Sequence, residues 1–71
     1  MPTNKSYSVT YYLDASHEIR WRARSRNNRI QADSGEGYKR LGSAEKAAKD
    51  LFGVRYFEFK IINETGHKFP S

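Results

Sequence analysis

The chain has 71 residues, and its 13 lysines and arginines against 8 aspartates and glutamates give a net charge of +5. A chain of this length forms one domain with a small core, because it buries only about 60% of its unfolded surface. The absence of cysteine excludes disulfides, thiolate catalysis and cysteine-based metal sites. The sequence has no signal-peptide core and no run of about 20 apolar residues that could span a membrane. We therefore expect a cytoplasmic protein with no membrane partner.

Three strands are predicted in the first half of the chain. Residues 7–13 and 19–26 alternate between apolar and polar side chains, with a period of two that is typical of half-buried strands. Asn27 and Asn28 then predict a two-residue hairpin, since asparagine tolerates the positive φ that a type I′ turn requires. A third strand is expected to begin at Ile30.

A helix and a fourth strand are predicted in the second half. The polar, glycine-rich residues 33–37 would turn the chain away from the sheet, with glycines that permit positive φ. An amphipathic helix is expected over 43–52, with Ser43 as its N-cap and Gly53 as its left-handed C-cap. Residues 56–62 alternate again, which indicates a strand. The expected fold is α+β, an antiparallel sheet of order strand-strand-strand-helix-strand with the helix on one face.

The predicted core gathers the apolar side chains of these elements. We assign Trp21 to it, because the single tryptophan shares its strand face with other apolar residues and would anchor the packing beneath the helix. The full set is Tyr7, Val9, Tyr11, Ile19, Trp21, Ile30, Leu51, Phe52, Phe57 and Phe59.

The end of the chain resembles its first strand at a shift of fifty residues. Tyr7, Val9 and Tyr11 align with Phe57, Phe59 and Ile61. Residues 1–55 would then form one full unit, and residues 56–71 the start of a truncated second unit. Two strands followed by polar turns also look alike by chance. A strand cut off from its unit needs a sheet, which its own chain or a second protomer could supply, and we expect a homodimer.

One stretch of the sequence carries a family resemblance. Residues 20–52 read RWRARSRNNRIQADSGEGYKRLGSAEKAAKDLF, with SGEGY at 34–38 as the most specific piece. In this pattern the chain resembles the YegP-like small domain family of largely uncharacterised bacterial and archaeal proteins. The resemblance implies a similar fold, in units that occur in tandem or as dimers. The chain departs from the family at residues 39–42, and the family has no established activity, so no catalytic residue is implied.

The net positive charge is concentrated in residues 20–29, which hold five arginines and no acidic residue. Alternate side chains on one strand face stand about 6.7 Å apart, a spacing that suits successive phosphates. Tyr12 would join this face if the first two strands pair, and its ring could stack on a base or a guanidinium. The candidate nucleic-acid-binding residues are Arg20, Arg22, Arg24, Arg26, Arg29 and Tyr12. Alternatively, this is a solvated face whose arginines are offset by Glu18, Asp33 and Glu58.

Other patterns in the sequence do not support catalysis. A metal site would require His17 and His67 to converge with carboxylates. Residues 33–37 lack the Lys-Ser/Thr pair of a phosphate-binding P-loop. Asp14 and Ser16 lie in the same turn as His17, where three neighbours cannot align as orienting group, nucleophile and base. We therefore expect no enzyme, no cofactor and no metal.

The predicted function is non-enzymatic binding of DNA or RNA through the arginine-lined sheet face. The alternative is a protein-interaction or inhibitor module that uses its sheet edge against an acidic protein partner. Salt-dependent retention on heparin and nucleic acid separates the two, because a protein-specific module has little affinity for generic polyanions.

Overall fold

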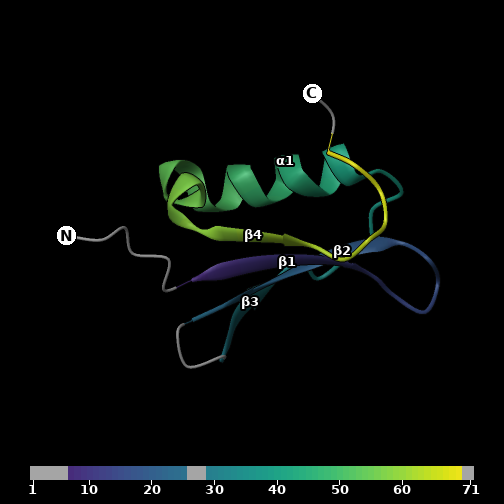
Figure 1. Ribbon diagram of the computed structural model, residues 1–71, viewed down its shortest axis with the longest axis horizontal. Coiled ribbons are helices and arrows are strands. Elements are labelled where there is room, and N and C mark those ends of the chain that lie inside the picture. The colour runs from purple at the N-terminus through teal and green to yellow at the C-terminus, as the bar shows by residue number, and fades with distance from the viewer. Residues whose placement is uncertain (1–6, 26–28, 70–71) are drawn as a thin grey trace.

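The computed structural model of the protein describes residues 7–25 and 29–69. The elements are β1 (Ser8–Leu13), β2 (Ile19–Arg24), β3 (Ile30–Asp33), α1 (Leu41–Phe52), the 3-10 helix η1 (Gly53–Glu58) and β4 (Lys60–Asn63). The predicted α+β fold is confirmed, because α1 packs on one face of a four-stranded sheet (Figure 1). The predicted hairpin at Asn27 and Asn28 lies outside the described residues, as does Arg26.

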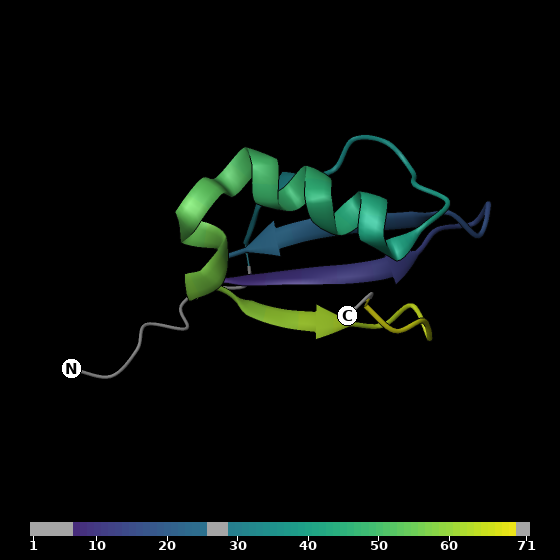
Figure 2. The same cartoon turned by 90° about the horizontal axis from the view of Figure 1, so that it is seen from above.

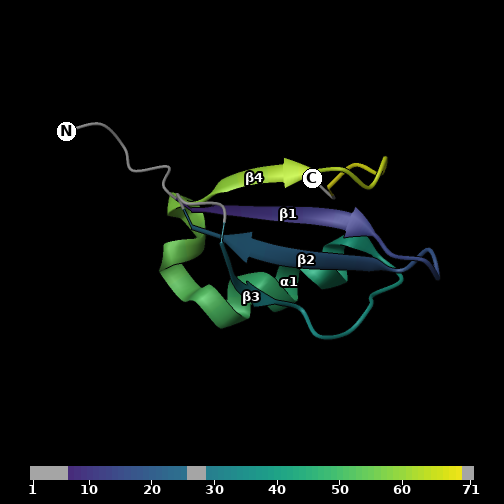
Figure 3. The same cartoon turned by 90° about the horizontal axis from the view of Figure 1, so that it is seen from below.

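The sheet has the strand order β3-β2-β1-β4 (Figure 3). β1 pairs antiparallel with β2, and β2 pairs antiparallel with β3. β4 pairs parallel with β1, in a register that sets Ile61 opposite Val9. The sheet is therefore mixed, and the prediction of an antiparallel sheet was wrong for this strand. The chain crosses back over the sheet through α1, so β4 runs in the same direction as β3 and β1.

α1 begins at Leu41, so the prediction of Ser43 as its N-cap was wrong. The N-cap residue is Arg40, in an extended conformation and without a side-chain cap. Leu41 is buried against the core. This packing stabilises a helix that starts before Ser43, the residue that the capping pattern indicated. The predicted C-cap position is confirmed, since the N–H of Gly53 donates to the carbonyl of Lys49, but its φ of 62° and ψ of −140° lie outside the left-handed helical region that was expected. No helix within the described ranges is long and apolar enough to cross a membrane.

The fourth strand is shorter than the predicted span of 56–62. The residues directly after α1 form η1, which turns Tyr56 into the core. There the Tyr56 hydroxyl lies 2.8 Å from the hydroxyl of Tyr11. The alternating pattern of this segment is overridden by that buried contact, and the strand starts only at Lys60.

The turns after β1 and β4 are built alike. Asp14 Oδ1 accepts the N–H of Ser16 at 2.8 Å, and Asn63 Oδ1 accepts the N–H of Thr65 at 3.0 Å. Both are turns in which a side chain bonds the backbone two residues on. The two turns correspond at a shift of 49 residues, so they do not follow the alignment at fifty, and the division into a full and a truncated unit stays a prediction.

The core lies between α1 and the sheet (Figure 2). Trp21 is buried, as predicted, and its ring meets that of Phe52 edge-on at 5.4 Å between centroids. Small alanines on the inner side of the helix allow it to approach the strands closely. The buried hydrophobic residues are Val9, Tyr11, Ile19, Trp21, Ala23, Leu41, Ala44, Ala48 and Tyr56.

Two residues that were predicted to lie in the core, Tyr7 and Ile30, are exposed. Tyr7 precedes β1 and stacks on the ring of Phe59, with centroids 5.7 Å apart, at the open end of the sheet. Ile30 pairs with Arg24, after a register shift between Ala23 and Arg24. An irregularity of one residue moves a side chain to the other face of a sheet, which explains why Ile30 lies outside the core.

Two predicted core residues near the end of the helix are also exposed. Leu51 lies at the margin of the buried helix face, and Phe52 takes the position against Trp21. Phe57 points to solvent because Tyr56 takes the inward position of η1. The prediction that Leu51 and Phe57 belong to the core was therefore wrong.

Candidate nucleic-acid interface

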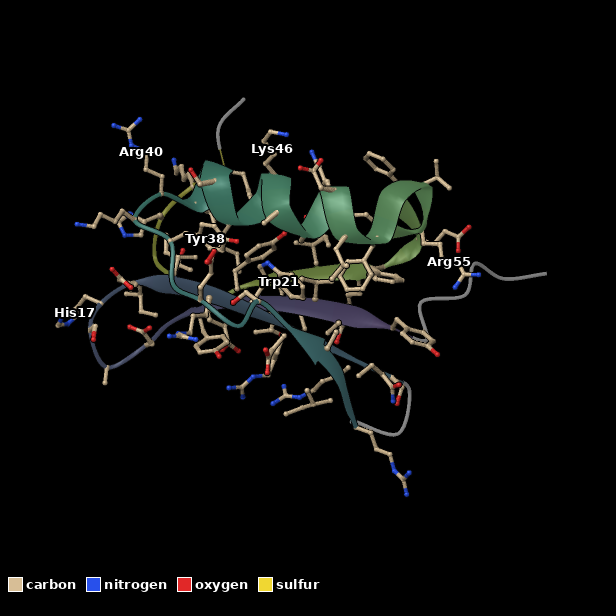
Figure 4. The ribbon with its side chains drawn as sticks, turned by 180° about the vertical axis from the view of Figure 1, so that it is seen from behind. His17, Trp21, Tyr38, Arg40, Lys46 and Arg55 are labelled. Carbon is tan, nitrogen blue, oxygen red and sulfur yellow. The ribbon has the colours of Figure 1, made fainter. Side chains whose placement is uncertain are left out.

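The three arginines of β2 lie on the sheet face that α1 leaves uncovered. Ile19, Trp21 and Ala23 are buried beneath the helix, and successive side chains of a strand point to opposite faces. The residues opposite the arginines on β1 are Tyr12, Thr10 and Ser8, for Arg20, Arg22 and Arg24 in that order. Figure 3 looks onto this face, and in Figure 4 nitrogen-bearing side chains extend from it, away from the helix. Tyr12 shares the arginine face, as predicted.

Arg22 is held by Tyr12. Its Nη2 donates to the Tyr12 hydroxyl at 3.0 Å, and its Cζ lies 4.4 Å from the centroid of the same ring. A guanidinium over an aromatic face gains cation–π attraction while other N–H groups remain available. Thr10 is buried between its neighbours on this face, so the sheet supports the Arg22 and Tyr12 pair from below.

Arg20 is engaged by a carboxylate within the chain. Its Nε donates to Asp14 Oδ2 at 2.6 Å, and the other oxygen of Asp14 accepts the backbone N–H groups of Ser16 and Glu18. The hydrogen bond from Arg20 lowers the pKa of Asp14 below its ordinary value. Arg20, one of the binding residues predicted from the sequence, is therefore not a free cation. The missed signal was Asp14, an acceptor placed at the strand end beside the first arginine.

Arg24 has a basic neighbour that sequence reasoning left out of the candidate set. Ser8 pairs with Arg24 on one side and with Lys60 of β4 on the other. Residues that pair across strands share a face, so Lys60 lies in line with Arg24 on the uncovered side. Only the strand register reveals this alignment, because the two residues are far apart in the sequence. We name Arg22, Arg24 and Lys60 the basic corner.

The acidic residues expected to offset the arginines do not pair with the basic corner. Asp33 lies opposite Arg22 on β3. The ion pairs of the described residues join Arg20 with Asp14, Lys46 with Asp50 and Lys49 with Glu45. The basic corner is thus without a carboxylate partner in that part of the chain.

Of the remaining candidates, Arg29 lies beside the basic corner and Arg26 lies outside the described residues. Arg29 is exposed, just before β3, and its carbonyl accepts the N–H of Ser25 at 2.9 Å. His17 lies in the turn between β1 and β2 with a φ of 63°, at the opposite end of β2 from Arg24 (Figure 4). Within residues 7–25 and 29–69, no three His, Cys, Asp or Glu side chains gather as metal ligands.

The fold defines a small α+β domain with four strands and one helix on a single sheet face. No model of a known protein family matches the chain, and no curated protein does. The chain is similar to the NMR solution structure of a protein from Haloferax volcanii, with 31% sequence identity and a TM-score of 0.63. The match covers 68% of this chain and 80% of the archaeal one. The chain belongs to the same family as this archaeal protein, and the likeness brings no activity with it.

Proposed function

We propose that the protein is a non-enzymatic module that binds DNA or RNA through the sheet face opposite α1. One observation carries the proposal: the basic corner gathers three cations on an uncovered face, and none pairs with a carboxylate in the described residues. Cations placed in this way neutralise phosphates and release counterions, which supplies most of the affinity of sequence-independent binding. A cytoplasmic location is part of this proposal.

The contact set differs from the full set of arginines. Arg20 contributes little to the field, because Asp14 neutralises it at 2.6 Å. Arg22 contributes with its guanidinium fixed in place by Tyr12, so less side-chain freedom is lost on binding. Arg24 and Lys60 extend the charge across three strands, which suits a backbone that crosses the sheet obliquely.

The test is the salt dependence of binding to single- and double-stranded oligonucleotides. The Arg22→Ala/Arg24→Ala variant should lower the slope of log affinity against log salt by about two, if each side chain contacts one phosphate. A matched control is Arg40→Ala/Arg55→Ala, which removes two arginines that pair with no carboxylate in the described residues, one before the start of α1 and one in η1 (Figure 4). The control should keep most of the slope. Wild-type protein without salt-dependent binding, or equal losses in both variants, would refute the proposal in favour of an acidic protein partner.

We also infer that the protein forms a homodimer through its apolar end, which we define as Leu51, Val54 and Phe57. These side chains are 61%, 82% and 72% exposed. They adjoin β4, which is an edge strand of the sheet formed by the described residues, so its outer backbone groups pair with no other strand in that part of the chain. A second copy fits this surface, because charges of both signs surround it on α1 and η1, so a two-fold arrangement can match them.

Membership of the YegP-like family remains an inference from the motif in residues 20–52. It is supported by the two glycines of SGEGY, each of which meets a distinct steric demand. Gly35 has a φ of 74°, and a Cβ at Gly37 would collide with the side chain of Glu18.

A further inference from the structure

A cavity of about 300 Å³ lies between the start of α1 and the C-terminal turn. It is at the opposite end of β2 from Arg24, because Ile19 forms part of its lining. Figure 1 shows the C-terminal segment, in yellow, rising beside the first turn of the helix. Its lining includes the side chains of Ile19, Lys39, Arg40, Leu41, His67 and Lys68.

Both walls of the cavity are fixed by hydrogen bonds or packing. On one side, Ile19 and Tyr38 exchange backbone hydrogen bonds of 2.7 and 2.8 Å, which tie the segment before α1 to β2. On the other side, Asn63 Nδ2 donates to the carbonyl of His67 at 2.7 Å. Phe69 meets Tyr11 edge-on at 5.2 Å between centroids and secures the end of this segment. Contacts within the chain therefore hold both walls of the cavity in place.

The lining is basic at the rim and apolar at the base. Lys39, Arg40 and Lys68 are exposed, and none of them pairs with a carboxylate in the described ranges. Among the residues that the structure describes, no acidic side chain belongs to the lining. Ile19 and Leu41 are buried and supply an apolar surface. Like charges that converge from two separate segments repel one another, and an anion between them removes that cost.

We propose that this cavity binds a small organic phosphate. The phosphate group lies among Arg40, Lys39 and Lys68, and the apolar part of the compound lies against Ile19 and Leu41. Arginine binds phosphate through two parallel N–H bonds, and lysine adds a mobile point charge. The volume is at the lower end for small-molecule sites, which favours a small compound over a polymer.

The first experiment follows the backbone amide signals of Leu41, Gly42 and His67 by NMR. The protein is titrated with phenyl phosphate, inorganic phosphate and phenol, with sodium chloride at matched ionic strength as the blank. Phenyl phosphate should shift these amides at the lowest concentration, inorganic phosphate should shift the same amides at higher concentration, and phenol should not. The proposal fails if these amides stay unshifted, or if chloride shifts them equally.

The second experiment tests which side chains bind the phosphate. Arg40→Gln and Lys68→Gln should each weaken the affinity for phenyl phosphate by about tenfold, the usual scale for losing a hydrogen bond to a charged group. Arg55→Gln is the matched control, since Arg55 lies at the far end of the helix from Arg40 (Figure 4). Equal affinity in Arg40→Gln and the wild type would overturn the assignment.

The proposed phosphate site and the proposed nucleic-acid function can be refuted separately. Arg22→Ala/Arg24→Ala should leave the phenyl phosphate affinity unchanged, because those residues lie on the other face of the sheet. Arg40→Gln/Lys68→Gln should leave the salt slope for oligonucleotides within about half a unit of the wild type. A loss of both kinds of binding in both variants would show one diffuse electrostatic effect and would refute a distinct phosphate site.

Discussion

At the scale of single residues, the hydroxyls of Tyr11 and Tyr56 form the only hydrogen bond between two buried side chains in the described part of the chain, at 2.8 Å. It ties η1 to the first strand. Burial raises the pKa of Tyr11, and the hydrogen bond with Tyr56 adds to that rise. Burial is also the main cause of the raised pKa of Tyr56. Each hydroxyl serves the other, so neither is left without a partner in the core.

Removing either hydroxyl alone should lower the free energy of unfolding by more than half of the amount that is lost when both are removed. Tyr56→Phe leaves the buried Tyr11 hydroxyl unpaired, so the free energy of unfolding should fall by about 1–3 kcal/mol. Tyr11→Phe should behave alike for the same reason. The double variant leaves no polar group unpaired, and its loss should be smaller than the sum of the single losses. Urea unfolding of the four proteins measures this, and strictly additive losses would contradict the buried pairing.

The same pair predicts a loss of stability in alkali. A group whose folded pKa is raised above its unfolded value stabilises the fold below the unfolded pKa and loses that contribution as the pH rises. For tyrosine the ordinary pKa is 10.0, so the free energy of unfolding should fall above about pH 10. The Tyr11→Phe/Tyr56→Phe variant should show a shallower fall. Denaturant unfolding at several pH values tests this, and parallel curves for variant and wild type would contradict it.

Residue roles were predictable from sequence where the neighbours along the chain decide them. The burial of Trp21 and the outward direction of Arg22 follow from strand alternation alone. The capture of Arg20 by Asp14 and the alignment of Lys60 with Arg24 were not predicted. Both depend on contacts between separate elements, which the alternation of one strand does not contain.

At the scale of elements, the turn between β3 and α1 is governed by its two glycines. Gly35 supplies the positive φ of 74°. Gly37 has a different role, because a Cβ added there would collide with the Cβ and the carboxylate of Glu18. This close approach lets Tyr38 pair with Ile19 and places the start of the helix over the sheet. The sequence predicted a glycine turn but attributed both glycines to backbone angles.

Gly37→Ala should therefore destabilise the fold by about 1–3 kcal/mol, the usual cost of forcing extra atoms into packed structure. Combining it with Glu18→Ala should restore part of the loss, because that change shortens the obstructing side chain. Gly35→Asn is the comparison, since asparagine tolerates positive φ, and nothing lies within 4 Å of a Cβ there. Thermal unfolding measures all three, and a Gly37→Ala protein as stable as the wild type would show that the turn moves freely.

Elements were predictable to the extent that their local pattern agrees with their packing. The first two strands were predicted because alternation and burial coincide in them. Residues 56–62 alternate equally well, yet η1 takes the first part of this span to bury Tyr56. The helix start at Leu41 likewise reflects packing and not capping. Tertiary contacts decide such cases, and a short window of sequence does not report them.

At the scale of the whole molecule, charged and apolar surfaces are separated. The basic corner lies on the uncovered sheet face, and the phosphate cavity lies at the start of α1. The apolar end lies where α1 passes into η1. Large apolar side chains clustered on a surface mark an interaction site, whereas single ones do not. A homodimer through the apolar end would leave the phosphate cavity open, whereas Lys60 of the basic corner, two residues beyond η1, would lie next to the interface.

Phe57→Ser tests the homodimer without disturbing the fold of one protomer. Phe57 is 72% exposed, so its replacement should change the stability of an isolated protomer by less than about 0.5 kcal/mol. In a dimer the same ring would be buried, and its loss should weaken association by about 1.5–3 kcal/mol. Light scattering at a series of protein concentrations should therefore show the weaker dimer in the variant. The variant should be monomeric at concentrations at which the wild type is still dimeric.

Ile30→Ser is the matched control for this measurement. Ile30 is also a large exposed apolar residue, at 54%, but it lies on β3, at the other edge of the sheet from β4. It should leave the dimer intact, since Ile30 pairs with Arg24 outside the core and two strands separate β3 from β4. A dimer weakened by Ile30→Ser and not by Phe57→Ser would move the interface to the β3 edge. Wild-type protein that stays monomeric at high micromolar concentration would remove the homodimer altogether, and the apolar end would then be a surface for a different protein.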